Sequence, residues 1–209
     1  MAKLNSEKGN ELRGVVGNVV FTHWKGIPIV KSKPGKRTKP PTPKQLFQRA
    51  KLHTVMEFLR PYRWVVNRYF EAETQGRTLH NISNSYYLNH VLRVDGEQLS
   101  IDVDKVILTK GGLRGLEEVT CNLPPEGNLY IAWKYTPNEA GSNPNDSLYI
   151  ALYAPDLPSG LLLLDTAHRE DSQMQISLPQ PYRSTVIHFW TGFIAHDQSQ
   201  ASWSSYLQL

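Results

Sequence analysis

The sequence predicts an α+β fold in which an N-terminal β-hairpin and helices precede an antiparallel β-sandwich. Three observations predict it. Two β-rich runs flank a glycine near the N-terminus, a helical pattern follows a proline-containing linker, and from Leu99 onward apolar and polar residues alternate. We expect two domains: a basic hairpin, linker and helical region over residues 1–98, and a β-sandwich over residues 99–209.

The hairpin is expected from residues 19–24 and 27–31, which Lys25-Gly26 separates. Pro28 has no N–H to donate, so the second strand should lie at the edge of its sheet. A two-stranded hairpin is marginal alone in water, so its apolar side chains need a surface to pack on. Two alternatives follow: the hairpin folds onto its own domain, or it binds a partner.

An exposed linker and a helix start follow the hairpin. Residues 31–39 mix basic residues with proline and glycine, which indicates extended backbone. Thr42 then suits the helix N-cap, Pro43 suits the first helical position, and Gln45 completes a capping box.

This first helix should run to about Arg60, because Pro61 stops it. Its apolar residues lie on two sides, so both sides need cover. Residues 61–70 are aromatic and compatible with helix, and a further helix is expected around residues 83–93.

Short strands are expected throughout the C-terminal half. The alternating runs are residues 99–103, 119–123, 129–135, 148–152, 174–178, 186–190 and 203–207, with a continuous apolar run at 161–164. Turn-forming glycine, proline, asparagine and aspartate separate them. Strands of this length and spacing are typical of an antiparallel sandwich.

Charge is distributed unevenly along the chain. Residues 1–51 hold 12 basic and 2 acidic residues, net +10, and residues 52–209 hold 11 basic and 17 acidic residues, net −6. The basic arm should therefore seek an anionic surface, on the same chain, a neighbouring copy, a nucleic acid or a different protein.

Cys121 is the only cysteine, which excludes an intrachain disulfide and fits a reducing compartment. The polar N-terminus has no signal-peptide pattern, and no apolar run approaches the roughly 18 residues of a membrane span. We expect a soluble protein in the cytoplasm or in a released particle.

No phosphate-binding loop, nucleophile elbow or His-Glu-x-x-His pattern is present in the sequence. Asp102 and Asp104 would share one strand face, which is more typical of a solvated face than of a catalytic pair. Asp165, His168 and Ser172 include triad residue types, but triads are assembled from distant elements. We therefore assign no catalytic, metal or cofactor residues and do not expect an enzyme.

Three C-terminal segments carry a resemblance to a known fold. NLYIAWKY has a tryptophan-bearing strand, SLYIALY is rich in tyrosine, and STVIHFWTGFIAHDQSQASWSSYL ends in a serine-rich strand. Together they resemble a fibronectin type III or related immunoglobulin-like domain. The resemblance implies an immunoglobulin-like sandwich over residues 99–209 and no particular function, since such sandwiches have many.

A second resemblance extends over nearly the whole chain. The segments GVVGNVVFTHWKGIPIVKSKP, TPKQLFQRAK, SIDVDKVILTKGGL and the terminal SSYL resemble an uncharacterised Bacteroidetes family classed as a domain of unknown function. That family implies no established activity. The Thr-Pro-x-Gln segment is also loosely similar to small phage and prophage proteins, which implies virion or tail-like assembly. Gly111-Gly112 departs from the single glycine usual in the family.

The sequence thus predicts a non-enzymatic structural or interaction protein that assembles through residues 14–51. The alternative is a nonspecific nucleic-acid-associated protein, because the basic arm can neutralise phosphates. Whether a small-molecule ligand binds stays open. The predicted partner-binding residues are the apolar hairpin side chains and the basic residues after them: Phe21, Trp24, Ile27, Ile29, Lys31, Lys33, Lys36, Arg37, Lys39 and Lys44.

Overall fold

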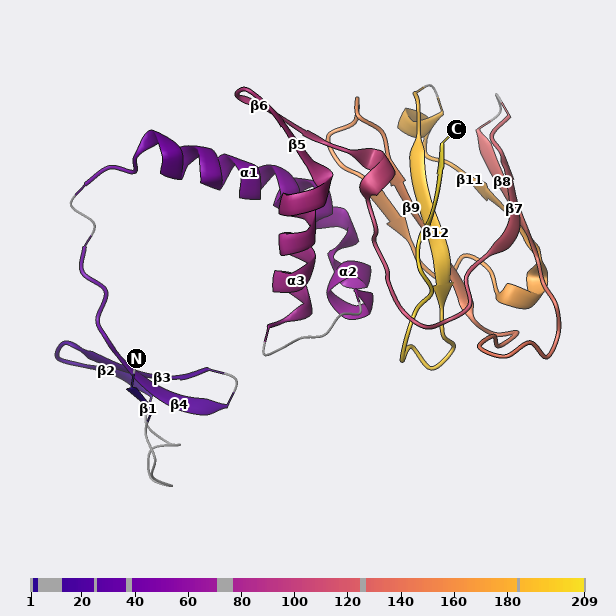
Figure 1. Ribbon diagram of the computed structural model, residues 1–209. Coiled ribbons are helices and arrows are strands. Elements are labelled where there is room, and N and C mark those ends of the chain that lie inside the picture. The colour runs from indigo at the N-terminus through magenta and orange to yellow at the C-terminus, as the bar shows by residue number, and fades with distance from the viewer. Residues whose placement is uncertain are drawn as a thin grey trace. The chain divides into compact units, whose positions relative to one another are not determined.

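The computed structural model describes residues 2–3, 13–24, 26–36, 39–70, 77–124, 127–183 and 185–208 (Figure 1). Its helices and antiparallel sheets make an α+β fold. The chain divides into two compact units, Met1–Pro43 and Lys44–Leu209.

The first unit is a four-stranded antiparallel sheet in the order β1-β4-β3-β2. Its strands are β1 (Ala2–Lys3), β2 (Gly14–Val16), β3 (Val19–Trp24) and β4 (Ile27–Ser32). The predicted hairpin is confirmed as β3 and β4, and Gly26 takes a φ of 78° in its turn.

The prediction that the strand with Pro28 is an edge strand is wrong. β4 lies between β3 and β1, and its pairing with β1 joins Val30 to Ala2 and Ile29 to Lys3. A proline removes only its own N–H, so the residues after it can still pair on both sides.

Helices open the second unit. They are α1 (Pro43–Leu59), the 3-10 turn η2 (Arg60–Tyr62), α2 (Arg63–Tyr69), α3 (Leu79–Tyr86) and the π-helical turn η3 (Tyr87–Val91). The predicted extent of α1 is confirmed. α3 begins four residues before the predicted start at 83, because the Thr78 side chain accepts a hydrogen bond from Asn81 N at 3.3 Å and caps the helix there.

Two antiparallel sheets follow, in the orders β11-β8-β7 and β10-β9-β12-β13. Their strands are β7 (Glu117–Asn122), β8 (Asn128–Lys134), β9 (Ser147–Tyr153), β10 (Leu161–Leu163), β11 (Gln173–Ser177), β12 (His188–Ile194) and β13 (Ser205–Gln208). Each overlaps one of the predicted runs.

The first predicted run of the sandwich folds differently. β6 (Gln98–Ile101) pairs with β5 (Leu92–Asp95) in a separate two-stranded sheet, and the 3-10 turn η4 (Val103–Lys105) follows. Gly96, with a φ of 58°, allows the tight turn between β5 and β6. The predicted run 99–103 therefore contributes to a local hairpin and not to the sandwich.

The β9–β12 sheet is covered on both faces (Figure 1). Leu148, Ile150 and Leu152 on β9 pack toward the other sheet, in a cluster that includes β8 and β12 side chains. Tyr149 and Ala151 point the opposite way and pack with buried residues of α1, α2 and η3. The domain boundary predicted after residue 98 runs through this helix–sheet cluster, whereas the compact units divide after Pro43.

Candidate functional site

Strand register assigns the side chains of the N-terminal sheet to two faces, because paired residues of antiparallel strands share a face. The face we call the Phe21 face carries Val16, Val19, Phe21 and Val30. The opposite face, the Trp24 face, carries Val15, Val20, Trp24, Ile27, Ile29 and Lys31. Both faces therefore carry several apolar side chains, beside polar ones such as Thr22 on the Trp24 face and His23 on the Phe21 face.

Little of this apolar surface is buried. Among residues 13–43, as far as the structure describes them, only Ile29 is buried, at 8% exposure. Trp24 is 59% exposed on one face, and Val16 is 68% exposed on the other. A sheet in water normally hides at least one face, so apolar side chains exposed on both faces mark an interaction surface.

The predicted lysines lie on β4, in the segment after it and at the start of α1. Lys31, Lys33, Lys36 and Lys39 are exposed, and so is Lys44 at the beginning of the second unit. Arg37 lies outside the described residues. None of the ion pairs between described residues includes any of these five lysines. Exposed lysines of this kind favour contact with an acidic surface.

The first part of α1 also lacks cover. Leu46 is 51% exposed, Leu52 is exposed too, and Val55 is the first buried residue of the helix. The second unit therefore has exposed apolar side chains of its own at the start of α1.

The structure brings together only part of the predicted partner-binding set. Trp24 and Ile27 are cross-strand partners, with Ile29 and Lys31 on the same face. Phe21 lies on the opposite face. Sequence reasoning missed Val15 and Val16 of the Gly-Val-Val segment, whose β-branched side chains after a glycine were the available signal.

The prediction that Asp102 and Asp104 share a strand face is wrong, because β6 ends at Ile101 and Asp104 lies in the turn η4. Asp102 is buried and forms ion pairs with Arg93 at 3.0 Å and Lys105 at 3.1 Å, whereas Asp104 is exposed. Burial alone would raise the pKa of Asp102, but hydrogen bonds from Lys105 and Arg93 lower it from its ordinary value. This carboxylate anchors the β5–β6 hairpin.

Replacing Asp102 by asparagine should lower the free energy of unfolding at neutral pH by about 1–3 kcal/mol. Because its folded-state pKa is depressed, the carboxylate stabilises the protein above its ordinary pKa of about 3.9, and this stabilisation is lost as pH falls through the folded-state pKa. The difference between wild type and variant should therefore shrink at acid pH. Urea unfolding at several pH values tests this, with the exposed Asp95→Asn as control; a constant difference would contradict it.

The triad residue types also remain apart. No hydrogen bond or ion pair found between described residues joins Asp165, His168 and Ser172 to one another. Instead the His168 backbone N–H donates to Asp171 Oδ2 at 2.6 Å, which closes a short turn.

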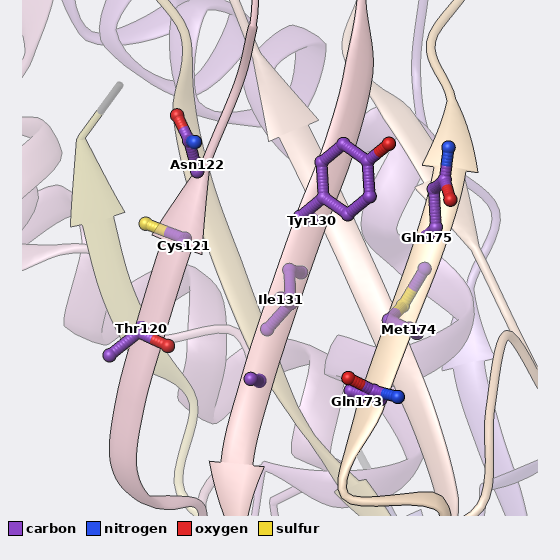
Figure 2. A pocket seen from close by; sticks show the side chains of 9 residues that line it. Thr120, Cys121, Asn122, Tyr130, Ile131, Gln173, Met174 and Gln175 are labelled. Atoms are coloured by element: carbon purple, nitrogen blue, oxygen red, sulfur yellow. The ribbon is translucent and has the colours of Figure 1, made fainter.

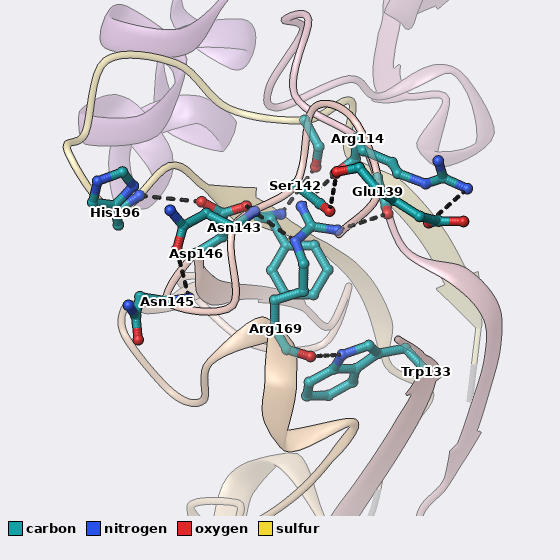
Figure 3. Close-up of polar contacts among 12 residues, drawn as sticks. Arg114, Trp133, Glu139, Ser142, Asn143, Asn145, Asp146, Arg169 and His196 are labelled. Atoms are coloured by element: carbon teal, nitrogen blue, oxygen red, sulfur yellow. Dashed lines mark hydrogen bonds and ion pairs between the residues drawn. The ribbon is translucent and has the colours of Figure 1, made fainter. Parts of the chain in front are cut away.

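Among the residues that the structure describes, the most buried ion pair joins Arg169 to Asp146 (Figure 3). Arg169 Nε donates to Asp146 Oδ2 at 3.0 Å, and its Nη2 donates to the carbonyl of Arg114 at 2.6 Å. Asp146 Oδ2 also accepts from the backbone N–H of Asn143 at 2.9 Å, and the Arg169 carbonyl accepts from Trp133 Nε1 at 2.8 Å.

These contacts tie three loops together and leave the guanidinium no open side. Its carbon lies 3.9 Å from the centre of the Phe193 ring. Burial lowers the pKa of Arg169, and the Asp146 carboxylate opposes that effect. We assign this network to stability.

The part of the chain that the structure describes contains neither a metal-binding cluster nor a membrane-spanning helix. No group of three or more His, Cys, Asp or Glu side chains there is arranged to hold a metal ion. No helix there is long and apolar enough to cross a membrane.

Fold and site together define a two-unit α+β protein whose candidate functional site is an apolar, basic N-terminal sheet. The chain belongs to a family of unknown function (DUF6266), which matches residues 11–208. The resemblance to an uncharacterised family over nearly the full length is thereby confirmed. None of the curated proteins compared with the chain matches it.

Proposed function

We propose that this protein is a non-enzymatic structural subunit that assembles with further copies through residues 14–51. The observation that carries the proposal is the N-terminal sheet with exposed apolar side chains on both faces. Burying apolar surface favours association, so the exposed valine, isoleucine and tryptophan side chains support an assembly.

Charge supports another copy of the chain as the partner. Residues 1–51 carry a net charge of +10 and residues 52–209 a net charge of −6, so the arm of one copy is complementary to the body of the next. The exposed lysines would steer the approach, and the apolar faces would supply the affinity.

The order of the strands supports an immunoglobulin-like sandwich of the fibronectin type III kind as the body of this subunit. Counting from β7, the first, second and fifth strands share one sheet, and the third, fourth, sixth and seventh share the other. Immunoglobulin-like sandwiches divide their strands in a closely similar way. A phage-derived or tail-like particle in Bacteroidetes is the setting that the sequence resemblances favour.

Deleting residues 1–40 should abolish self-association and leave the second unit folded. Both apolar clusters of that unit consist of residues from Val55 onward, so the deletion removes none of its core. Size-exclusion chromatography with light scattering measures the association, and circular dichroism checks the fold. A truncated protein that still assembles, or a full-length protein that is monomeric at all concentrations, would contradict the proposal.

A matched pair of double variants narrows the test to the Trp24 face. Trp24→Ser with Ile27→Ser alters an exposed cross-strand pair and should weaken association in the full-length chain. Val94→Ser with Val186→Ser alters two exposed apolar residues of the second unit and should leave it unchanged.

The exposed lysines favour nonspecific nucleic-acid binding as the second candidate function. Phosphate contacts make such binding fall steeply as salt rises. The ratio of absorbance at 260 and 280 nm in the same chromatography distinguishes the two. Nucleic acid carried only at low salt by a monomer supports this alternative.

A further inference from the structure

A second, unrelated feature lies on the outer face of the β11-β8-β7 sheet. Leu129, Ile131 and Trp133 of β8 point into the core between the two sheets, so Tyr130 and Ala132 point outward. An open depression of about 470 Å3 lies over this part of the sheet (Figure 2). Its volume is within the roughly 300–1,000 Å3 of small-molecule pockets.

Strand register arranges the outward side chains in two rows. Asn122, Tyr130 and Gln175 are cross-strand partners and form the first row, which Figure 2 shows crossing the strands. In the second row Ala132 lies between its partners Thr120 and Gln173. The methyl group of Ala132 is small, so the depression can reach the sheet between two longer polar side chains, beside the Tyr130 ring.

The lining mixes polar and apolar residues and carries no charge. Its residues are Thr120, Cys121, Asn122, Tyr130, Ile131, Ala132, Gln173, Met174 and Gln175, none of which is acidic or basic. In the described part of the chain, the side-chain hydrogen bonds use none of the five outward polar side chains, those of Thr120, Asn122, Tyr130, Gln173 and Gln175. The charges at one end of this face, Lys134 and Glu118, pair with each other at 2.6 Å.

We propose that this depression binds a neutral carbohydrate. Each sugar hydroxyl both donates and accepts hydrogen bonds, and so do the amides of Asn122, Gln173 and Gln175 and the hydroxyl of Thr120. Tyr130 is 40% exposed, and its ring offers an aromatic surface to the C–H groups of a sugar ring.

The same chemistry disfavours other small ligands. A phosphate or carboxylate group would find no basic side chain within the lining. A lipid would leave three amide side chains without hydrogen-bond partners. The site belongs to the second unit and does not involve residues 14–51. A test of carbohydrate binding is therefore independent of a test of the proposed assembly.

Binding of maltotriose, cellotriose, mannotriose and triacetylchitotriose to the full-length protein tests the proposal, with trigalacturonic acid as a charged comparison. Saturation-transfer NMR at millimolar sugar reports binding, and titration gives the affinity. At least one neutral sugar should bind. Tyr130→Ala should lower its affinity about tenfold or more, and Gln175→Ala should lower it several-fold.

Trp64→Ala is the matched control. Trp64 is an aromatic residue on α2 whose exposed fraction, 42%, is similar to that of Tyr130, and it lies outside the lining. It should leave sugar binding unchanged. Thermal unfolding checks that each variant is folded. Failure of every neutral sugar to bind, binding of the acidic sugar alone, or equal affinity of the Tyr130→Ala variant would overturn the proposal.

Discussion

Replacing Arg169 by methionine should lower the free energy of unfolding by about 3–5 kcal/mol, because it leaves a buried carboxylate without its counter-ion. The side chains of Arg169 and Asp146 are 5% and 1% exposed, and Arg169 Nε lies 3.0 Å from Asp146 Oδ2. Methionine fills part of the volume but replaces neither the charge nor the hydrogen bond to the Arg114 carbonyl. Urea unfolding followed by tryptophan fluorescence measures the change.

The control for this variant is an exposed ion pair. Arg60 Nη1 and Glu57 Oε2 lie 3.2 Å apart on the surface of the second unit, and the two side chains are 61% and 49% exposed. Arg60→Met should change the free energy of unfolding by less than about 1 kcal/mol. Equal effects of the two substitutions would mean that burial of the Arg169 pair contributes nothing.

Replacing Gly160 by alanine should destabilise the protein by about 3 kcal/mol or more. A Cβ there would overlap the hydroxyl of Tyr62, which donates a hydrogen bond to the Leu152 carbonyl, and would lie 2.8 Å from that carbonyl oxygen. Tyr62 is fully buried, so its ring must shift within a packed core and the carbonyl loses its partner.

Gly112→Ala is the control for this second substitution. A Cβ at that position would meet only the end of the Gln200 side chain, at 3.6 Å. Urea unfolding should find Gly112→Ala within about 0.5 kcal/mol of wild type. A Gly160→Ala protein equally close to wild type would show that Tyr62 can move without cost.

Alternation predicted the sandwich strands because burial fixes which side chains of a strand face the core. Leu129, Ile131 and Trp133 are an example, since their polar and small neighbours point outward. Local chemistry likewise predicted the start of α1 at Pro43. Both signals lie within a few neighbouring residues.

Long-range pairing could not be predicted in this way. β1 and β2 are short, and nothing in their sequence identifies β4 and β3 as their neighbours. The cover of the β9–β12 sheet by helices did leave a signal, since Tyr149, Ala151 and Trp190 are not the residues expected on a solvated face.

The candidate sites differ in how far sequence could predict them. Trp24 and Ile27 are neighbours across a local hairpin, so their joint exposure follows from a short segment. The depression around Tyr130 combines three strands, and Gln175 reaches it only through the register of β11 with β8. The alternation of apolar and polar residues within one strand does not predict which residues of another strand lie beside it.

The helix–sheet cluster also affects the order of events during synthesis. Val65 and Tyr87 leave the ribosome early, but their partners Tyr149 and Trp190 belong to strands made much later. The apolar sides of α2 and η3 therefore stay uncovered while most of the sandwich is still being translated. Contacts of such long sequence separation slow folding, and nascent chains that expose apolar helices depend on chaperones. The nascent chain should accordingly need protection until β12 has emerged.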